Sequence, residues 1–193
     1  MYNISKVADE QANVGEGPLW DDETQVLYWA DIRSGRLFEY NPTTGENKTI
    51  YTGIFVGGFS KNSFGGLTLG TWNGVLLWES ERKKRWIHQG TFKGEKLQFN
   101  DCIAAPDGSF LAGTFYPSNV LGYEKTGKLY RFFPNGDVEI ISENNQQLPR
   151  TNNYYMYISA AGLDLLYGGP VRECYAAPLF VVMLPAAWAD GPI

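Results

Sequence analysis

The stretch "VGEGPLWDD", residues 14–22, places the carboxylate of Glu16 between two glycines and ahead of Pro18. Glycine and proline mark turns, and an acidic residue in a turn is ordinarily solvated. The alternative is that the turn points the carboxylate at a ligand, because hard cations such as Ca²⁺ and Mg²⁺ prefer oxygen donors. The residue types alone leave both interpretations open.

A second polar pair, Asn100 and Asp101, lies in "FNDCIAAPDGSF". An asparagine carbonyl together with the Glu16 carboxylate is a mixture of oxygen donors suited to a hard cation. The pair Asn100 and Asp101 is also common in turns, where the side chains bond to their own backbone. The sequence alone therefore does not decide between a chemical role and a structural role for this pair.

The other polar residues that could do chemistry have structural explanations. His88 is the only histidine, and it follows Trp86 and Ile87 on an expected outer strand, so no Ser-His-Asp spacing supports a triad. Asp107-Gly108 and Asn135-Gly136 are typical of hairpin turns. We therefore assign no chemistry to these positions.

Charge and composition exclude several classes of function. The net charge of −5 argues against nucleic acid as a partner, and the one basic run, residues 81–85, is expected to be a solvated hairpin end. A hydrophobic share of 44% with 19% charged residues is ordinary for a soluble globular protein. Abundant aromatic residues and glycines favour short strands joined by tight turns.

Cysteine content and apolar runs bear on location. Cys102 and Cys174 are the only cysteines, which predicts a reducing compartment and no disulfide framework. The N-terminus lacks the basic start and apolar core of a secretion signal. The longest apolar run, Tyr175–Ala189, is too short and too broken by proline to span a bilayer. The expectation is a cytoplasmic protein with no membrane partner.

The chain repeats a unit of turns and short strands. The cleanest copy has one strand at Val26–Trp29 and the next at Arg36–Tyr40, and copies begin near Asp22, Asn62, Asp107 and Ala161. A period of roughly 40 to 50 residues with four short strands is typical of β-propeller blades. Three blades and part of a fourth do not close a ring, so open blade edges predict possible self-association.

The end of the chain departs from this pattern. Residues 171–193 show neither alternation nor turn chemistry, and their prolines oppose both a central strand and a long helix. The sequence therefore predicts a partial β-propeller over 1–170 and an atypical C-terminal tail over 171–193.

Three motifs carry a resemblance to a known family: "GEGPLW" with "YWADIRSGRLFEY", "FGGLTLGTWNGVLLW", and "FNDCIAAPDGSFLAGTF" with "GKLYRFFPNG". Together they resemble the N-terminal part of the regucalcin/gluconolactonase family, also called the senescence marker protein and luciferin-regenerating enzyme-like family. The resemblance implies an all-β fold of the six-bladed β-propeller type, here incomplete. It also implies one divalent cation in the central channel and hydrolysis of a sugar lactone.

The resemblance assigns roles to individual residues. It makes Glu16 the first metal ligand and makes Asn100, beside Asp101, a residue of the substrate cavity. It places a further asparagine ligand at Asn152 or Asn153. It puts an aspartate that serves as ligand and general base near position 200, beyond Ile193.

Two substrate-binding positions differ from many members. Gln98 stands where an arginine is common, and Ser118 where some members have an acidic residue. A glutamine can donate a hydrogen bond to a sugar hydroxyl, but it does not clamp an anion. The preferred lactone therefore stays open.

The sequence leads to two hypotheses. The first is an enzyme, a metal-dependent sugar lactonase among the carboxylic ester hydrolases, using Ca²⁺, Zn²⁺, Mn²⁺ or Mg²⁺, with activity impaired in this chain because the base aspartate is missing. The second is a non-catalytic, propeller-derived module that binds a cation or a protein partner.

Overall fold

The computed structural model describes residues 5–114, 127–143, 156–158, 165–167 and 180–181. All regular elements in these ranges are β-strands, so the described part of the chain contains no helix that could cross a membrane. Three four-stranded antiparallel sheets dominate, each with its strands in sequence order. The all-β expectation is confirmed.

Each sheet forms one blade. Blade 1 consists of β2 (Gly15–Asp21), β3 (Val26–Asp31), β4 (Arg36–Asn41) and β5 (Glu46–Thr52). Blade 2 consists of β6 (Val56–Lys61), β7 (Leu67–Thr71), β8 (Gly74–Ser80) and β9 (Lys83–Gln89). Blade 3 consists of β12 (Phe99–Ala104), β13 (Phe110–Thr114), β14 (Lys128–Phe132) and β15 (Val138–Glu143).

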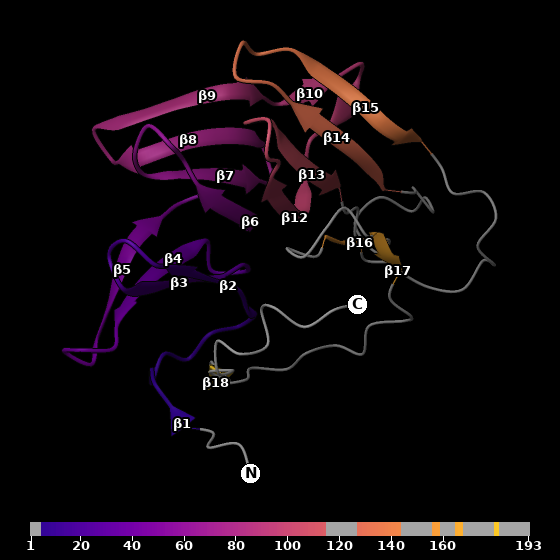
Figure 1. Ribbon diagram of the computed structural model, residues 1–193. Coiled ribbons are helices and arrows are strands. Elements are labelled where there is room, and N and C mark those ends of the chain that lie inside the picture. Colours follow the sequence, from indigo (N-terminus) through magenta and orange to yellow (C-terminus); the bar gives the residue numbers. More distant parts are fainter. Residues whose placement is uncertain (1–4, 115–126, 144–155, 159–164, 168–179, 182–193) are drawn as a thin grey trace, which may run out of the picture.

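The blades fan around a common centre. Figure 1 shows β2, β6 and β12 on the inside and β5, β9 and β15 on the outside. This is the arrangement of β-propeller blades, in which the first strand of each sheet faces the central channel. The strands expected at 26–29 and 36–40 are present as β3 and β4.

The innermost strands begin earlier than the sequence repeats suggested. The copies near Asp22, Asn62 and Asp107 start in the turns that follow β2, β6 and β12. The sequence analysis did not recognise the start of these inner strands, because their glycines and irregular apolar spacing are typical of loops. Glu16 accordingly lies within strand β2, whose register shifts between Glu16 and Leu19. Gly17 there has a φ of 64°, a left-handed conformation that glycine adopts without strain.

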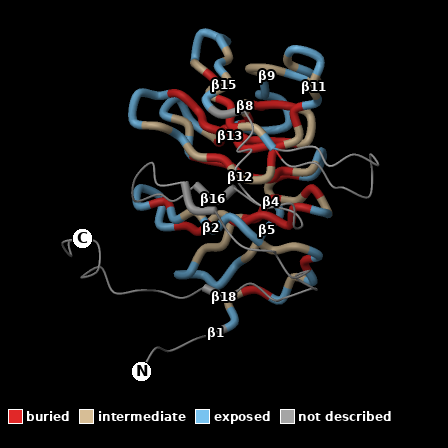
Figure 2. The backbone as a smooth tube through the Cα atoms, turned by 90° about the vertical axis from the view of Figure 1, so that its right-hand side faces the viewer, coloured by how far each residue is buried: buried red, intermediate tan, exposed pale blue. Residues whose placement is uncertain are grey.

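Apolar side chains fill the spaces between blades. One buried cluster joins blades 1 and 2 through residues that include Leu37, Val56, Leu69 and Trp78. A second joins blades 2 and 3 through residues that include Val75 and Tyr130. Figure 2 shows the buried positions concentrated along the strands and the exposed positions at the turns. Each blade is thus held by its neighbour, as a propeller requires.

The other face of blade 1 is covered by the chain's own N-terminal segment, which we define as residues 7–12. Ala8 and Ala12 pack with Trp29 and Phe38, and both aromatic residues are fully buried. Their rings stack with centroids 4.1 Å apart. The indole nitrogen of Trp29 donates to Asn47 at 3.0 Å. This face of blade 1 therefore carries a packed layer.

A buried carboxylate fixes the end of this segment. Asp31, with no exposed surface, accepts hydrogen bonds from the Val14 amide at 2.9 Å and from Ser34 at 2.6 Å. It also pairs with Arg36 at 3.0 Å. Burial by itself would raise the pKa of Asp31, but the hydrogen bonds from Ser34, Val14 and Arg36 outweigh it and lower that pKa. The charged form is therefore the one that holds the segment.

The remaining strands are short. β10 (Thr91–Phe92) pairs with β11 (Glu95–Lys96), β16 (Met156–Ile158) pairs with β17 (Leu165–Tyr167), and β1 (Ser5–Lys6) pairs with β18 (Phe180–Val181). The β16–β17 pair lies at the expected start of a fourth repeat. The division at residue 170 remains a prediction, because most of 171–193 lies outside the described residues.

Candidate functional site

The three inner strands present equivalent positions to the centre of the fan. In each blade, the first inner residue in the ladder pairs with the last residue of the second strand: Gly15 with Asp31, Val56 with Thr71, and Phe99 with Thr114. At the next step of the ladder, Glu16 pairs with Ala30, Gly58 with Gly70, and Asp101 with Gly113, whereas Gly57 and Asn100 fall at register shifts. The fold therefore brings Glu16 and Asp101 to the same level of the inner strands, with Asn100 next to Asp101.

One buried polar residue at the end of the second strand supports the backbone at this level in each blade. Asp31, Thr71 and Thr114 are all buried, and each bonds into the hairpin that follows it. The Thr71 hydroxyl donates to the Gly74 carbonyl at 2.9 Å, and the Thr114 hydroxyl accepts from the Lys128 amide at 2.8 Å. The sequence analysis missed these residues; their common place at the end of each second strand was the available signal.

Glu16 lies in a negative environment. The residue as a whole is exposed, yet the protein desolvates its carboxyl group and thereby raises its pKa, and the charge of Asp101 raises it further. Asp101 comes from blade 3, so carboxylates of two different blades lie close enough for the charge of Asp101 to affect the pKa of Glu16. Such a pair is costly alone and favours a bound cation.

Asn100 and Asp101 lie at an irregularity in β12. The register shifts between Phe99 and Asp101, which leaves Asn100 outside the ladder. The Asp101 carboxylate accepts a hydrogen bond from the Cys102 amide at 2.8 Å. Both side chains are half-buried. The turn-like bonding considered from the sequence is thus present, on a strand that borders the channel.

The donor set is chemically suited to a hard cation but incomplete in the described residues. Glu16, Asn100 and Asp101 offer oxygen atoms only, which is the preference of Ca²⁺, Mg²⁺ and Mn²⁺. No group of three or more histidine, cysteine or acidic residues with metal-binding geometry occurs in the part of the chain that the structure describes. Of the other predicted site residues, Gln98 is half-buried just before β12, whereas Ser118, Asn152 and Asn153 lie outside the described ranges.

The residues given structural roles are placed accordingly. His88 approaches the Thr91 carbonyl at 3.0 Å and packs edge-on against Phe92. Asp107 accepts from the Ser109 amide at 3.0 Å, and Asn135 from the Asp137 amide at 3.0 Å, as hairpin turns require. Residues 81–85 include the β8–β9 hairpin end, where Glu81 pairs with Lys84.

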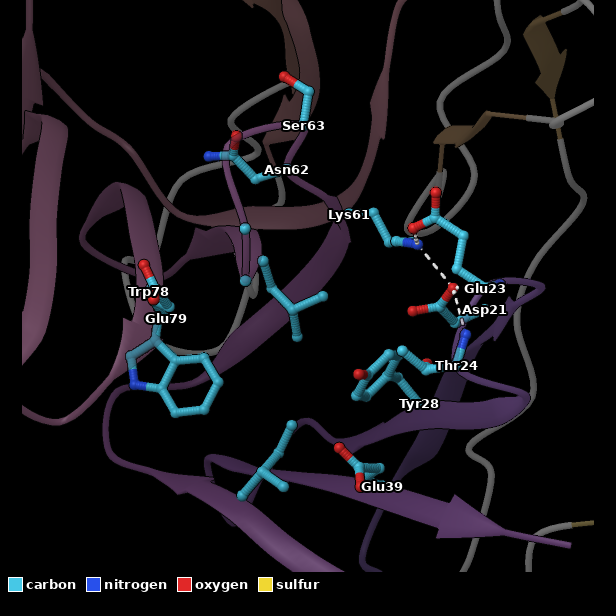
Figure 3. A pocket seen from close by; sticks show the side chains of 14 residues that line it. Asp21, Glu23, Thr24, Tyr28, Glu39, Lys61, Asn62, Ser63, Trp78 and Glu79 are labelled. Carbon is cyan, nitrogen blue, oxygen red and sulfur yellow. Dashed lines mark hydrogen bonds and ion pairs between the residues drawn. The ribbon is translucent and has the colours of Figure 1, made fainter.

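A groove of about 740 Å³ lies between blades 1 and 2, at the opposite end of β2 from Glu16. Figure 3 shows Tyr28 and Trp78 on opposing sides of it and Lys61 held by Asp21 and Glu23. The Lys61 ammonium lies 2.6 Å from Asp21 and 2.7 Å from Glu23. The charges of these three residues are satisfied within the protein, and the groove includes none of the residues at the Glu16 level.

The Asp21–Lys61 pair predicts a dependence of stability on pH. The hydrogen bond from Lys61 is the main cause that lowers the pKa of buried Asp21 from 3.8 to about 2. A lowered carboxyl pKa contributes stability above the unfolded value and loses it as the pH falls towards the folded value. We expect the urea midpoint of the protein to fall between about pH 4 and pH 2 more steeply than that of Asp21→Asn. An equal fall of the urea midpoint in the two proteins across this pH window would contradict the role assigned to the Asp21–Lys61 pair.

Comparisons with known proteins show what this chain is similar to. Residues 14–151 match the family model described as the SMP-30/Gluconolactonase/LRE-like region. The chain is 32% identical over 165 residues to YvrE of Bacillus subtilis, a protein named provisionally as a sugar lactone lactonase, covering 82% of this chain and 56% of that protein. It is 31% identical over 142 residues to pentonolactonase XacC of Haloferax volcanii, covering 72% of this chain and 45% of that protein.

Solved structures show the same fold. Calcium-binding regucalcin from Agrobacterium tumefaciens superposes with a TM-score of 0.61 at 17% identity, covering 72% of this chain and 46% of that one. A luciferin-regenerating enzyme superposes with a TM-score of 0.59 at 24% identity, covering 72% and 49%. The chain thus spans about half the length of the relatives that it matches.

Proposed function

Because this chain belongs to the SMP-30/gluconolactonase/LRE-like family, we propose that it serves the hydrolysis of a sugar lactone to the corresponding sugar acid. The observation that carries the proposal is that Glu16 and Asp101, from different blades, stand at the same level of their inner strands and interact electrostatically, with Asn100 next to Asp101. Carboxylate and amide oxygens of this kind are donors that suit a divalent cation. The relatives' names, which include lactonases for different sugar acids, support the substrate class.

In this proposal Glu16 holds the cation, together with Asn152 or Asn153. Ca²⁺, Zn²⁺, Mn²⁺ or Mg²⁺, when bound, would supply a Lewis acid for the lactone carbonyl. Asn100 donates its amide hydrogens to the sugar, and Asp101 fixes the local backbone through the Cys102 amide. Gln98 and Ser118 offer neutral contacts to hydroxyl groups, which favours an uncharged sugar lactone over an anionic one.

The resemblance puts the aspartate that serves as ligand and general base near position 200, outside the 193 residues of this sequence. A chain that binds the cation with no turnover would instead support the second candidate, a non-catalytic cation-binding module. Self-association through blade edges and a cytoplasmic location belong to the same proposal.

An assay on the purified chain tests this function. We expect acid release from D-glucono-1,5-lactone, followed in a pH-stat, to depend on added Mn²⁺, Zn²⁺ or Ca²⁺ and to stop when EDTA is present. Lactones hydrolyse spontaneously, so the rate is compared with that of buffer and metal alone. Equal rates with and without protein, at every metal tested, would overturn the enzymatic proposal.

A further inference from the structure

The inner strands of blades 2 and 3 approach each other more closely than side chains would permit. At Gly57 of β6, a Cβ atom would stand 2.0 Å from the Phe99 carbonyl oxygen and 2.8 Å from the Asn100 Cα atom. At Gly58, it would stand 2.5 Å from the Cys102 backbone nitrogen. Such distances lie far inside van der Waals contact, so the backbones of β6 and β12 touch directly.

A third glycine extends this contact. A Cβ atom on Gly70 of β7 would meet the Cys102 sulfur at 2.0 Å. Gly57 therefore lies against Phe99 and Asn100. Gly58 and Gly70 lie against Cys102. Elsewhere, large side chains such as Phe99 and Tyr130 fill the space between blades 2 and 3. The glycine contact is confined to the register shift that carries the two polar side chains.

We propose that Gly57, with Gly58 and Gly70, is a positioning element that sets where Asn100 and Asp101 stand relative to Glu16. The catalytic consequence rests on the proposed function, whereas the structural consequence does not. Backbone atoms have no freedom to rotate out of the way, so a methyl group on Gly57 must push β12 from blade 2. A shift of about 1 Å at a site that orients a substrate can reduce activity roughly 100-fold.

The test compares Gly57→Ala with Gly66→Ala. Gly66 lies in the same blade just before β7, at the far end from Thr71; its φ is 71° and a Cβ there would meet the Trp78 carbonyl at 2.3 Å. Gly66→Ala thus carries a comparable backbone clash, and a positive φ in addition, away from Asn100. We expect Gly57→Ala to lower kcat/KM for gluconolactone about 100-fold and to shift the NMR signal of the Asn100 side-chain amide. Gly66→Ala should leave both unchanged.

A second set of variants keeps the inference testable if Gly57→Ala does not fold. Gly70→Ala should shift the same Asn100 signal, and adding Cys102→Ala, which removes the clashing sulfur, should restore it. If the parent chain shows no turnover, the proposed function fails and the NMR comparison decides this inference alone. An unshifted Asn100 signal in folded Gly57→Ala, or in Gly70→Ala, would overturn it.

Discussion

Replacing Glu16 by glutamine should reduce cation-dependent lactone hydrolysis about 100- to 1,000-fold, because a Lewis acid contributes several kcal/mol and each tenfold in rate corresponds to about 1.4 kcal/mol. Glutamine keeps the shape of the side chain but removes the charge that, in the proposed function, holds the cation. The variant should remain as stable as the parent or become more stable, since desolvation and Asp101 disfavour the charged form of Glu16.

The matched control for this change is Glu46→Gln. Glu46 is exposed on β5, the outer strand of the same blade, and its replacement removes the same charge from the protein. It should leave both turnover and metal affinity unchanged. Cation affinity, measured by isothermal titration with Mn²⁺, should weaken in Glu16→Gln alone. Equal cation affinities in parent and Glu16→Gln would remove Glu16 from the metal site.

Replacing Trp29 by alanine should lower the free energy of unfolding by about 3–5 kcal/mol. Trp29 has no exposed surface, stacks on Phe38 and donates to Asn47. The substitution leaves a cavity under residues 7–12 and takes away the indole donor. Because whole domains are stable by only about 5–15 kcal/mol, a loss of this size is a large fraction of the total.

Urea unfolding followed by circular dichroism measures this loss. Phe64→Ala is the control, because Phe64 is 90% exposed and its truncation should change stability by less than about 0.5 kcal/mol. Amide hydrogens of residues 7–12 should also exchange faster in Trp29→Ala, since the segment loses its principal contact. A loss below about 1.5 kcal/mol for Trp29→Ala would contradict the view that this layer is tightly packed.

The second and third strands of blade 1 were predictable from sequence. Val26–Trp29 is a β-branched and aromatic run bounded by turn residues, and β3 forms there because its side chains pack on both faces. The inner strands were not predictable in the same way. Segments such as "VGGFSK" contain glycine where the fold needs backbone contact, and glycine in isolation indicates a turn.

The candidate site was predictable in part. Glu16 and Asn100 were assigned to the site through the family resemblance, because no local sequence pattern predicts that residues from different blades lie together. The closeness of Asp101 to Glu16 depends on how blade 3 packs on blade 2. That packing is a contact between distant parts of the chain. The role of residues 7–12 escaped the sequence analysis for the same reason: "VADEQA" has no periodicity, and its function is to cover Trp29.

The shared register of Glu16, Gly58 and Asp101 has a consequence for redesign. At this step of each inner strand the residue pairs with Ala30, Gly70 or Gly113 of the second strand. Blades 1 and 3 carry an acid there, whereas a Cβ atom on Gly58 of blade 2 would stand 2.5 Å from the Cys102 backbone nitrogen. The charge at this level can therefore be redesigned at positions 16 and 101, whereas position 58 must stay glycine.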